Sequence, residues 1–272
     1  RMGACHDTDG GALPEDWDDR FVDYYARQSE TPRTRRRFEG VMQRVLRARA
    51  HERLPVAALD VADIGCNAGT QCLLWARAGH RVQGLDINAK LLAVARERTE
   101  RAGLAVAYHE GSATAVPWPD ASFDVCLLVE LLEHVQDWES VLAEACRILR
   151  PGGTLYVSTT NRLCPRQSEF DLPLYSWYPA GLKRRCERLA VTTRPEWVNH
   201  TRFPAVHWFS PHGLAAWIRR RGFRTLDRFD VLEGAGRGLP ARVAIWLIRH
   251  LPPVRFLAHV ATPSATVIGI RR

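Results

Sequence analysis

The chain has 272 residues, which is enough for one large α/β domain with a sizeable hydrophobic core. Hydrophobic residues make up 46% and charged residues 25%, and no apolar run approaches the length of a membrane span. The formal net charge is +8, but the basic residues are scattered apart from a few short clusters. We therefore predict solvated helix faces and no nucleic-acid partner.

Cysteine usage points to a reducing compartment. The chain has seven cysteines, an odd number, and no two of them form a Cys-x-x-Cys pair. This pattern predicts reduced, mostly buried thiols in a cytoplasmic protein rather than a disulfide or zinc framework. We expect Arg1 to be a vector remnant before a native start, and we expect no secretory segment to follow it.

The N-terminal part is predicted to be a helical cap. Trp17, Phe21, Tyr24 and Tyr25 recur at helical spacings. A second helix follows them, because a threonine can cap it at position 31 and a proline suits its first position. We assign residues 1–50 to this cap.

From residue 60 onward, predicted strands and helices alternate. The strands are predicted at 60–66, 80–87, 104–112, 123–130, 154–161, 223–233 and 264–272. The helices between them are predicted at 70–78, 89–101, 137–149 and 211–221. Buried apolar strands that alternate with helices predict a parallel sheet covered on both faces.

The alternation breaks at Arg162. The next residues, 162–209, are rich in proline and aromatic side chains. A structureless loop of that length is unusual in a compact domain, so we predict an inserted lid or acceptor-binding subdomain. Residues 51–161 and 210–272 are assigned to the ligand-binding sheet domain.

A glycine-containing loop, DIGCNAGT at residues 63–70, follows the first predicted strand. In open parallel sheets, ligands bind at the carboxyl ends of such strands. A P-loop needs GxxxxGK[ST], and no lysine follows Gly69. A dinucleotide fingerprint needs GxGxxG, which the spacing of Gly65 and Gly69 does not match. The loop therefore favours neither phosphate hydrolysis nor a pyrophosphate.

Two acids accompany this loop. Asp63 lies two residues before Gly65, where a carboxylate suits a cation or an amine better than a pyrophosphate. Asp86 ends the second predicted strand and can accept hydrogen bonds from both hydroxyls of a ribose. Together they suit a nucleoside with a positively charged amino-acid tail, which describes S-adenosylmethionine.

Four motifs in order resemble those of the Rossmann-like S-adenosylmethionine-dependent methyltransferases, from residue 60 to the C-terminus. They are DIGCNAGT, GLDINAKLL, EGSATAVPWPDASFDVC and ILRPGGTLYVST. Asn67 stands where a middle glycine is common, and asparagine tolerates left-handed backbone. The resemblance implies a doubly wound, mostly parallel seven-stranded sheet with an antiparallel last strand and a helical insertion after strand five.

The same resemblance implies a cofactor site. The residues expected to contact S-adenosylmethionine are Asp63, Gly65, Cys66, Asn67, Gly69, Asp86, Ile87, Ser112, Ala113, Val129 and Arg33. Helices at the N-terminus are expected to cover the cofactor, and either Arg33 or Arg35 is expected to bind its carboxylate.

Two more segments, VELLEHVQDW at 129–138 and STTNR at 158–162, resemble the ubiquinone-biosynthesis O-methyltransferase branch. This implies O-methylation of a phenolic, catechol-like or quinol hydroxyl in a bacterial biosynthetic pathway. A sugar hydroxyl, an amine or a carbon stays open as the acceptor. A second class of protein, a non-catalytic membrane-associated nucleotide-binding protein, also stays open.

Three residues are the candidate catalytic groups: His134, Glu130 and His207. An imidazole with an ordinary pKa of about 6.5 is suited to take the proton of an acceptor hydroxyl. As an alternative, Glu130, Glu133 and His134 could hold Mg²⁺ or Mn²⁺, which would lower the pKa of the acceptor. The structural alternatives are that Glu133 and His134 only cap a helix or pack on the sheet.

Two amphipathic segments are candidates for contact with a membrane surface. Residues 179–191 combine one apolar face with several basic residues, and residues 239–260 are apolar but interrupted by arginines and a Pro-Pro pair. Either segment could admit a lipid-like acceptor at the inner membrane. The alternatives are a lid on the protein's own pocket and a dimer contact.

Overall fold

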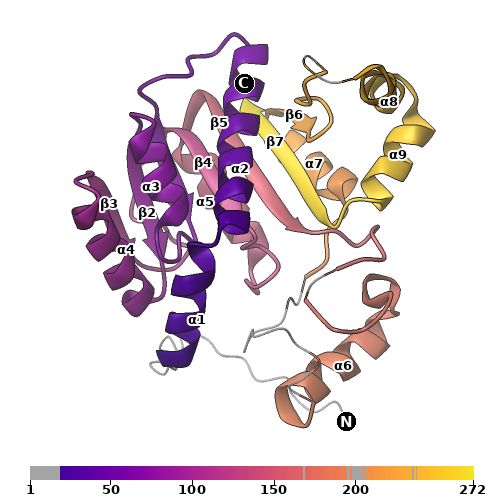
Figure 1. Cartoon of the computed structure of the whole chain (residues 1–272), viewed down its shortest axis with the longest axis horizontal. Coiled ribbons are helices and arrows are strands. Elements are labelled where there is room, and N and C mark those ends of the chain that lie inside the picture. The colour runs from indigo at the N-terminus through magenta and orange to yellow at the C-terminus, as the bar shows by residue number, and fades with distance from the viewer. Residues whose placement is uncertain are drawn as a thin grey trace.

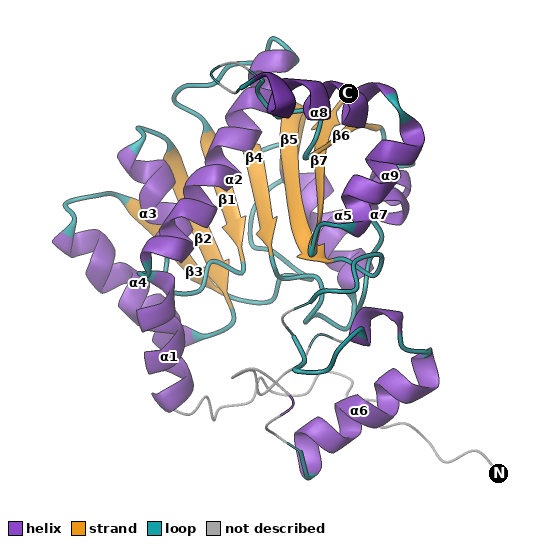
Figure 2. Cartoon of the chain, turned by 45° about the vertical axis from the view of Figure 1, so that its right-hand side comes forward, coloured by secondary structure: helices purple, strands orange, loops and turns teal. Residues whose placement is uncertain are grey.

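The computed structural model describes residues 19–167, 169–194, 197, 205, 207–234, 236 and 238–272. The predicted helical position of Trp17 lies outside these residues. A seven-stranded sheet with strand order β3-β2-β1-β4-β5-β7-β6 forms the centre of the molecule (Figures 1 and 2). Its strands are β1 (Asp60–Ile64), β2 (Arg81–Asp86), β3 (Val106–Glu110), β4 (Phe123–Val129), β5 (Leu149–Thr160), β6 (Phe223–Asp227) and β7 (Ser264–Arg271).

The sheet confirms the predicted fold class. Strands β1 to β5 pair in parallel, and β7 runs antiparallel between β5 and β6. The central strand β4 is apolar along nearly its whole length because helices cover both of its faces. Because β1 and β4 are parallel neighbours, their carboxyl ends and the loops that follow lie at one edge of the sheet.

Nine α-helices occur within the described residues. They are α1 (Asp19–Ser29), α2 (Pro32–His51), α3 (Thr70–Arg77), α4 (Ala89–Arg101), α5 (Trp138–Ile148), α6 (Ala180–Thr192), α7 (Pro211–Arg219), α8 (Leu239–His250) and α9 (Pro252–Val260). Thr31 caps α2 by accepting a hydrogen bond from the Thr34 amide, and a proline occupies the first turn, as predicted.

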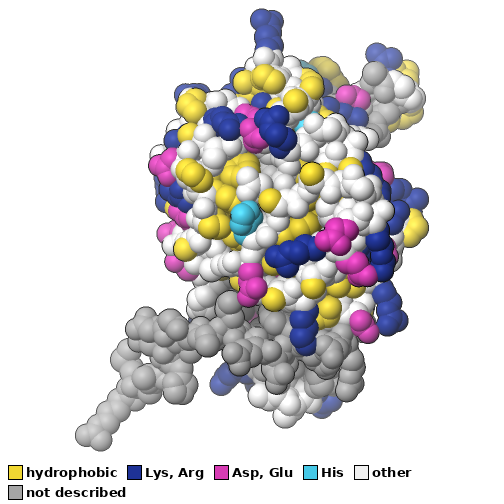
Figure 3. Space-filling model, turned by 90° about the vertical axis from the view of Figure 1, so that its left-hand side faces the viewer, with side chains coloured by type: hydrophobic (Ala, Val, Ile, Leu, Met, Phe, Trp, Pro, Cys, Tyr) yellow, Lys and Arg dark blue, Asp and Glu magenta, His cyan; other side chains and the backbone are white. Residues whose placement is uncertain are grey.

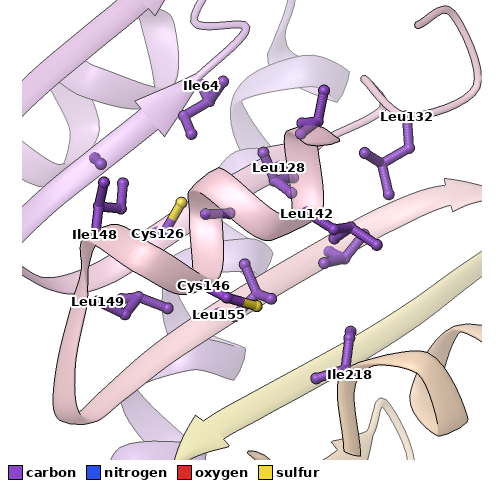
Figure 4. Close-up of a cluster of buried hydrophobic side chains, with 14 of the residues drawn as sticks. Ile64, Cys126, Leu128, Leu132, Leu142, Cys146, Ile148, Leu149, Leu155 and Ile218 are labelled. Carbon is purple, nitrogen blue, oxygen red and sulfur yellow. The ribbon is translucent and has the colours of Figure 1, made fainter. Parts of the chain in front are cut away.

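The hydrophobic core has one part on each face of the sheet. Helices α5 and α7 pack on one face around Leu128, Leu142 and Ile218 (Figure 4). Helices α2 and α3 cover the opposite face, where Val45 and Trp75 are fully buried. Helix α2 is therefore part of the core as well as part of the cap.

Two predicted boundaries differ from the structure. The strand predicted at 223–233 ends at Asp227, because the backbone turns there: the Asp227 amide donates to Asp230 Oδ2, and the Phe229 amide donates to Asp227 Oδ1. Strand β5 begins at Leu149, five residues before its predicted start, because the RPGG segment continues the strand after α5.

The insertion after β5 has a small core of its own. Phe170 stacks on Tyr175 with ring centroids 4.1 Å apart, and Cys186 and Ala190 of α6 pack against them. Leu182, on the same helix, is 43% exposed. This separate cluster supports the division into a sheet domain and an inserted subdomain, which stays a proposal.

The surface is mixed in charge over the face at the β3 edge. Arginine, lysine and acidic side chains alternate there, with apolar side chains between them (Figure 3). In the part of the chain that the structure describes, no helix is both long and apolar enough to cross a bilayer.

Candidate active site

A cleft of about 760 Å³ lies at the carboxyl ends of β1 and β4, where the sequence predicts a ligand. Three parts of the chain form it. Helices α1 and α2 contribute Tyr24, Tyr25, Gln28, Ser29, Thr31, Arg33, Thr34, Arg37 and Phe38. The β1–α3 loop contributes Asp63, Gly65, Cys66, Asn67, Ala68, Thr70 and Gln71. The β4–α5 loop and the insertion contribute Val129, Glu130, Glu133, His134 and Glu169.

The glycine loop depends on left-handed backbone. Gly65, Asn67 and Gly69 have φ values of 77°, 50° and 74°. The side chain of Asn67 supports its own turn, since Asn67 Oδ1 accepts a hydrogen bond from the Ala68 amide at 2.7 Å. Asparagine thus replaces a glycine without loss of the loop shape, as predicted from its tolerance of this conformation.

Asp86 fastens the loop to β2. Its Oδ2 accepts from the Asn67 amide at 2.8 Å, and its Oδ1 accepts from the Asn88 amide at 2.9 Å. A carboxylate has about four acceptor positions, so Asp86 can accept a hydroxyl group in addition to the amides of Asn67, Asn88 and Ile87. Burial raises the pKa of Asp86, while the backbone amides of Asn88 and Asn67 oppose this.

Asp63 forms the cleft floor at the end of β1. It is 3% exposed, and the Cys72 thiol donates to its Oδ2 at 3.3 Å. Burial raises the pKa of Asp63 to about 7. A cation in the cleft would favour the ionised form of this carboxyl group, because opposite charge lowers the pKa of an acid.

The sequence analysis missed Gln71, which also lines the cleft. Its side chain is 3% exposed, and neither the amide oxygen nor the amide nitrogen has a hydrogen-bond partner among the described residues. Buried polar atoms in folded proteins nearly always have a partner, so this amide fits a polar ligand in the cleft. The available signal was a glutamine in the first turn of an otherwise buried helix, directly after the glycine loop.

The side of the cleft formed by the β4–α5 loop and the insertion is acidic. Glu133 is fully buried, and its Oε2 accepts from Thr159 Oγ1 at 2.7 Å, whereas Oε1 has no partner among the described residues. Burial, with a further contribution from Glu130, raises the pKa of Glu133 well above its ordinary value. This shift favours the protonated form of Glu133, which can donate a hydrogen bond as well as accept one.

Glu169, from the insertion, is a second residue that the sequence analysis missed. Burial and the nearby Glu130 raise its pKa to about 7. The pKa of Tyr25 is raised to about 12 by burial and then by Glu169, which places the insertion and α1 at the same cleft. A carboxyl group that titrates near neutral pH is suited to proton transfer.

The structure does not support the predicted metal site. Within the described residues, no group of three or more His, Cys, Asp or Glu side chains could hold a metal ion. The predicted ligands Glu130, Glu133 and His134 are close in sequence, but Glu133 turns into the protein and binds Thr159. These residues do not fit a metal ion.

Several other predicted residues do not line the cleft, among them Asp86, which reaches it only through its bond to the Asn67 amide. Ser112 is exposed and Ala113 is buried just past the end of β3, and Ile87, 36% exposed, follows β2. Gly69 packs inside the loop instead of facing the cleft, since an added Cβ would lie 2.5 Å from Tyr108 Oη. The cofactor roles of these residues stay predictions.

Of the residues predicted in the N-terminal cap and at the edge of the insertion, only some line the cleft. Arg33 lines the cleft, together with Arg37, whereas Arg35 lines a separate surface hollow beside α3 and α4. His207 lies outside the lining, where its Nε2 is 3.0 Å from the backbone oxygen of Gln136. The catalytic role predicted for His207 stays a prediction. His134, the other predicted histidine, lines the cleft.

Arg98 of α4 joins the cap to the glycine loop. Its guanidinium donates to the backbone oxygens of Ala26 and Ala68, at 2.8 and 3.2 Å, and to Ser29 Oγ at 2.9 Å. The first and last of these groups belong to the C-terminal end of α1, where a cation is favoured by the helix dipole. Arg98 therefore fixes the helix that supplies two tyrosines to the cleft.

Comparison with known proteins agrees with this architecture. A methyltransferase domain model matches residues 62–157, which is less than half of the chain. A ubiquinone biosynthesis O-methyltransferase of Methylococcus capsulatus is 40% identical over 108 residues, which cover 39% of this chain and 46% of that protein. One from Ralstonia nicotianae is 40% identical over 109 residues, covering 40% and 46%. The chain thus matches about half of the length of these curated relatives.

Solved structures show the same fold. A methyltransferase of Thermotoga maritima, described as a possible histamine N-methyltransferase, has a TM-score of 0.50 at 20% identity, covering 93% of this chain and 97% of that one. The [4+2]-cyclase SpnF has a TM-score of 0.53 at 19% identity, covering 88% and 81%. Proteins with different described reactions share this fold, so the fold alone does not fix the reaction.

Proposed function

Residues 62–157 carry a methyltransferase domain, and from this premise we propose that the chain is an S-adenosylmethionine-dependent methyltransferase of small molecules. The acceptor group we propose is a phenolic, catechol-like or quinol hydroxyl, and the compartment is the cytoplasm. One observation carries the proposal: the cleft at the ends of β1 and β4 joins the glycine loop to a polar acceptor side.

The side chains around the cleft fit the proposed cofactor. Asp86 would bind the ribose hydroxyls, and Asp63 and the unpartnered Gln71 amide would bind the cationic amino-acid end. Arg33 or Arg37, beside the first turn of α2, would bind the carboxylate, because both a guanidinium and a helix N-terminus favour an anion.

The bound cofactor would supply a methyl group on a positively charged sulfur, which is an electrophilic carbon. An acceptor oxygen attacks that carbon in line, the carbon–sulfur bond breaks, and the bonding electrons stay on sulfur. The hydroxyl proton must pass to a base at the same time or shortly before. The cleft walls contribute mainly by positioning the acceptor and excluding water.

We assign the base to His134, which lines the cleft on the loop after β4. Glu169 is the second candidate, since its carboxyl group faces the same cleft and its pKa is raised to about 7. Glu130 lines the same cleft and has a left-handed backbone with φ of 53°. We propose that Glu130 orients the acceptor hydroxyl.

Methyl transfer from labelled cofactor to a panel of catechols and quinols tests the proposal. His134→Ala should lower kcat by about 10²-fold or more and leave the affinity for S-adenosylhomocysteine within about threefold, because a base acts mainly in the transition state. His51→Ala, at the exposed end of α2, is the matched control and should keep full activity.

Different outcomes separate the alternatives. Full activity in His134→Ala with loss in Glu169→Gln would transfer the base role to Glu169. Turnover with sugars, amines or a carbon acceptor, and none with phenolic hydroxyls, would keep the enzyme class and overturn the acceptor. Cofactor binding without turnover of any acceptor in the panel would favour the non-catalytic alternative.

A further inference from the structure

The hairpin of α8 and α9 places apolar side chains outward and polar side chains inward. None of the residues of α8 is buried. Leu239, Val243 and Trp246 follow one helical stripe and are 70%, 47% and 55% exposed. Leu257 of α9 is 63% exposed, and its neighbour Phe256 is 47% exposed.

The inward side of the hairpin is held by polar contacts. Arg255 and His259 of α9 bind Asp227 of β6, and each nitrogen lies within 2.9 Å of its carboxylate oxygen. Arg249 of α8 donates to the backbone oxygens of Phe229, Asp230 and Leu232. Because these contacts anchor the two helices, the apolar stripe stays directed away from the protein.

Two other roles for this surface, a lid over the cleft and a dimer contact, are disfavoured. No residue of α8 or α9 lines the cleft, so the hairpin is not a lid over it. It lies on the β6–β7 side of the sheet (Figures 1 and 2). A second copy docked hairpin to hairpin would offer Arg242 no acidic partner, because residues 239–260 contain no aspartate or glutamate, and a buried unpaired charge is costly.

The charge of the hairpin indicates what kind of partner binds to it. Residues 239–260 contain three arginines and no aspartate or glutamate, and the whole chain has a net charge of +8. Exposed Arg242 and His250 flank the stripe, and Trp246 stacks on His250 with centroids 4.9 Å apart. Tryptophan and arginine together on an exposed helix are typical of helices that lie at the boundary of an anionic bilayer.

We propose that the α8–α9 hairpin is a docking surface for anionic lipid bilayers. Both helices lie flat in the interface, because Pro252 separates two segments of 12 and 9 residues that are too short to span it. Leu239, Val243, Trp246 and Phe256 enter the headgroup region, and Arg242 binds lipid phosphate. The cleft opens elsewhere on the molecule and stays accessible.

Vesicle flotation tests this surface. The whole chain should float with phosphatidylcholine vesicles that contain about 30% phosphatidylglycerol, and bind them at least tenfold more tightly than pure phosphatidylcholine. The double variant Val243→Glu/Trp246→Glu should lose at least tenfold in binding. Arg242→Glu should lose binding to the anionic vesicles only, and it serves as the second variant if the double variant does not fold.

Matched controls come from exposed apolar residues elsewhere. Val56→Glu and Trp177→Glu replace side chains that are 42% and 56% exposed, and should bind vesicles like the native chain. Unchanged binding in both α8 variants would overturn the proposal. So would a lack of binding to anionic vesicles, or a dimer in light scattering that Val243→Glu/Trp246→Glu dissociates. Retained affinity for S-adenosylhomocysteine shows that a loss of vesicle binding is separate from the proposed enzymatic function.

Discussion

The β1–α3 region and the α8–α9 hairpin use hydrophobic residues in opposite ways. Residues Val61, Ala62 and Ile64 of β1 are fully buried, and every turn of the following loop is fixed by backbone or side-chain hydrogen bonds. In the hairpin, polar side chains make the internal contacts and apolar ones face outward. The first region also lies within the segment shared with known methyltransferases, whereas the hairpin lies outside it.

This contrast separates a segment that the methyltransferase domain model matches from one that it does not match. The shared region holds the proposed cofactor, and small changes there should affect folding or binding strongly. The hairpin adds little to folding through its apolar stripe, so changes there should affect contact with a partner. The following predictions test that difference, beginning with the largest expected effect.

Substitution of Gly69 by valine should unfold much of the protein. Its φ is 74°, and a Cβ would lie 2.5 Å from Tyr108 Oη and 2.8 Å from Ala95 Cβ. Together, clash and backbone strain should cost about 4 kcal/mol or more in the free energy of unfolding, measured in urea. Gly103→Val is the control, because φ is 62° there and nothing lies within 4 Å. Equal losses in both variants would show that the packing of Gly69 is unimportant.

A leucine of the sheet core and a leucine of the hairpin should differ in their contribution to the free energy of unfolding. Leu128→Ala, at a fully buried position of β4, should cost about 2–5 kcal/mol through lost burial and a cavity. Leu257→Ala, at a 63% exposed position of α9, should change the free energy of unfolding by less than about 0.5 kcal/mol. A large loss in Leu257→Ala would mean that the hairpin packs against the protein after all.

Removal of the Arg98 side chain should weaken cofactor binding without unfolding the chain. Arg98→Ala loses the contacts that hold the end of α1 against the loop at Ala68. The affinity for S-adenosylhomocysteine should fall by about tenfold, and α1 should become more sensitive to protease. Arg101→Ala, an exposed residue paired with Glu97, is the control. Unchanged affinity and protease sensitivity would remove the role of Arg98 in positioning α1.

The pH dependence of the cofactor affinity should be the smallest of these effects. Burial raises the pKa of Asp63 from 3.8 to about 7 in the folded chain. The unfolded chain therefore releases this proton at lower pH, and stability falls as the pH rises from about 4 to about 7 and is then constant. The cationic cofactor favours the carboxylate, so its affinity should rise by up to about tenfold between pH 6 and pH 8.

Calorimetry at the two pH values measures this rise. Asp63→Asn should bind more weakly and lose the pH dependence, while Glu169→Gln, which removes the other group with a pKa of about 7, should keep it. If the pH dependence is lost only in Glu169→Gln, the titrating group was assigned wrongly.

The fold was predictable because its signals are local. Alternating apolar runs and helices, with Gly65 and Asp86 at strand ends, identify the sheet and the ligand edge. The early end of β6 was not predictable, because Asp227 and Asp230 bind backbone amides that a strand would otherwise use. Its continuation, RFDVLE, still has the alternation of a strand.

The site was predictable only in part. The loop residues follow directly from the motif, but Glu133 binds Thr159 and Glu169 reaches the cleft from the insertion. Both placements depend on long-range packing, which sequence spacing does not encode. For the same reason, the close spacing of Glu130, Glu133 and His134 suggested a metal site that the described residues do not form.

The most direct test of the central claim is calorimetric titration of the chain with S-adenosylhomocysteine. We predict micromolar affinity, lost by about 30-fold or more in Asp86→Asn, because each hydrogen bond between a charged group and a ligand contributes about 1.5–3 kcal/mol. Glu110→Gln, at the matching register position of the neighbouring strand, should bind like the native chain. No binding by the folded chain, or equal binding by Asp86→Asn, would contradict the assignment of this cleft to the cofactor.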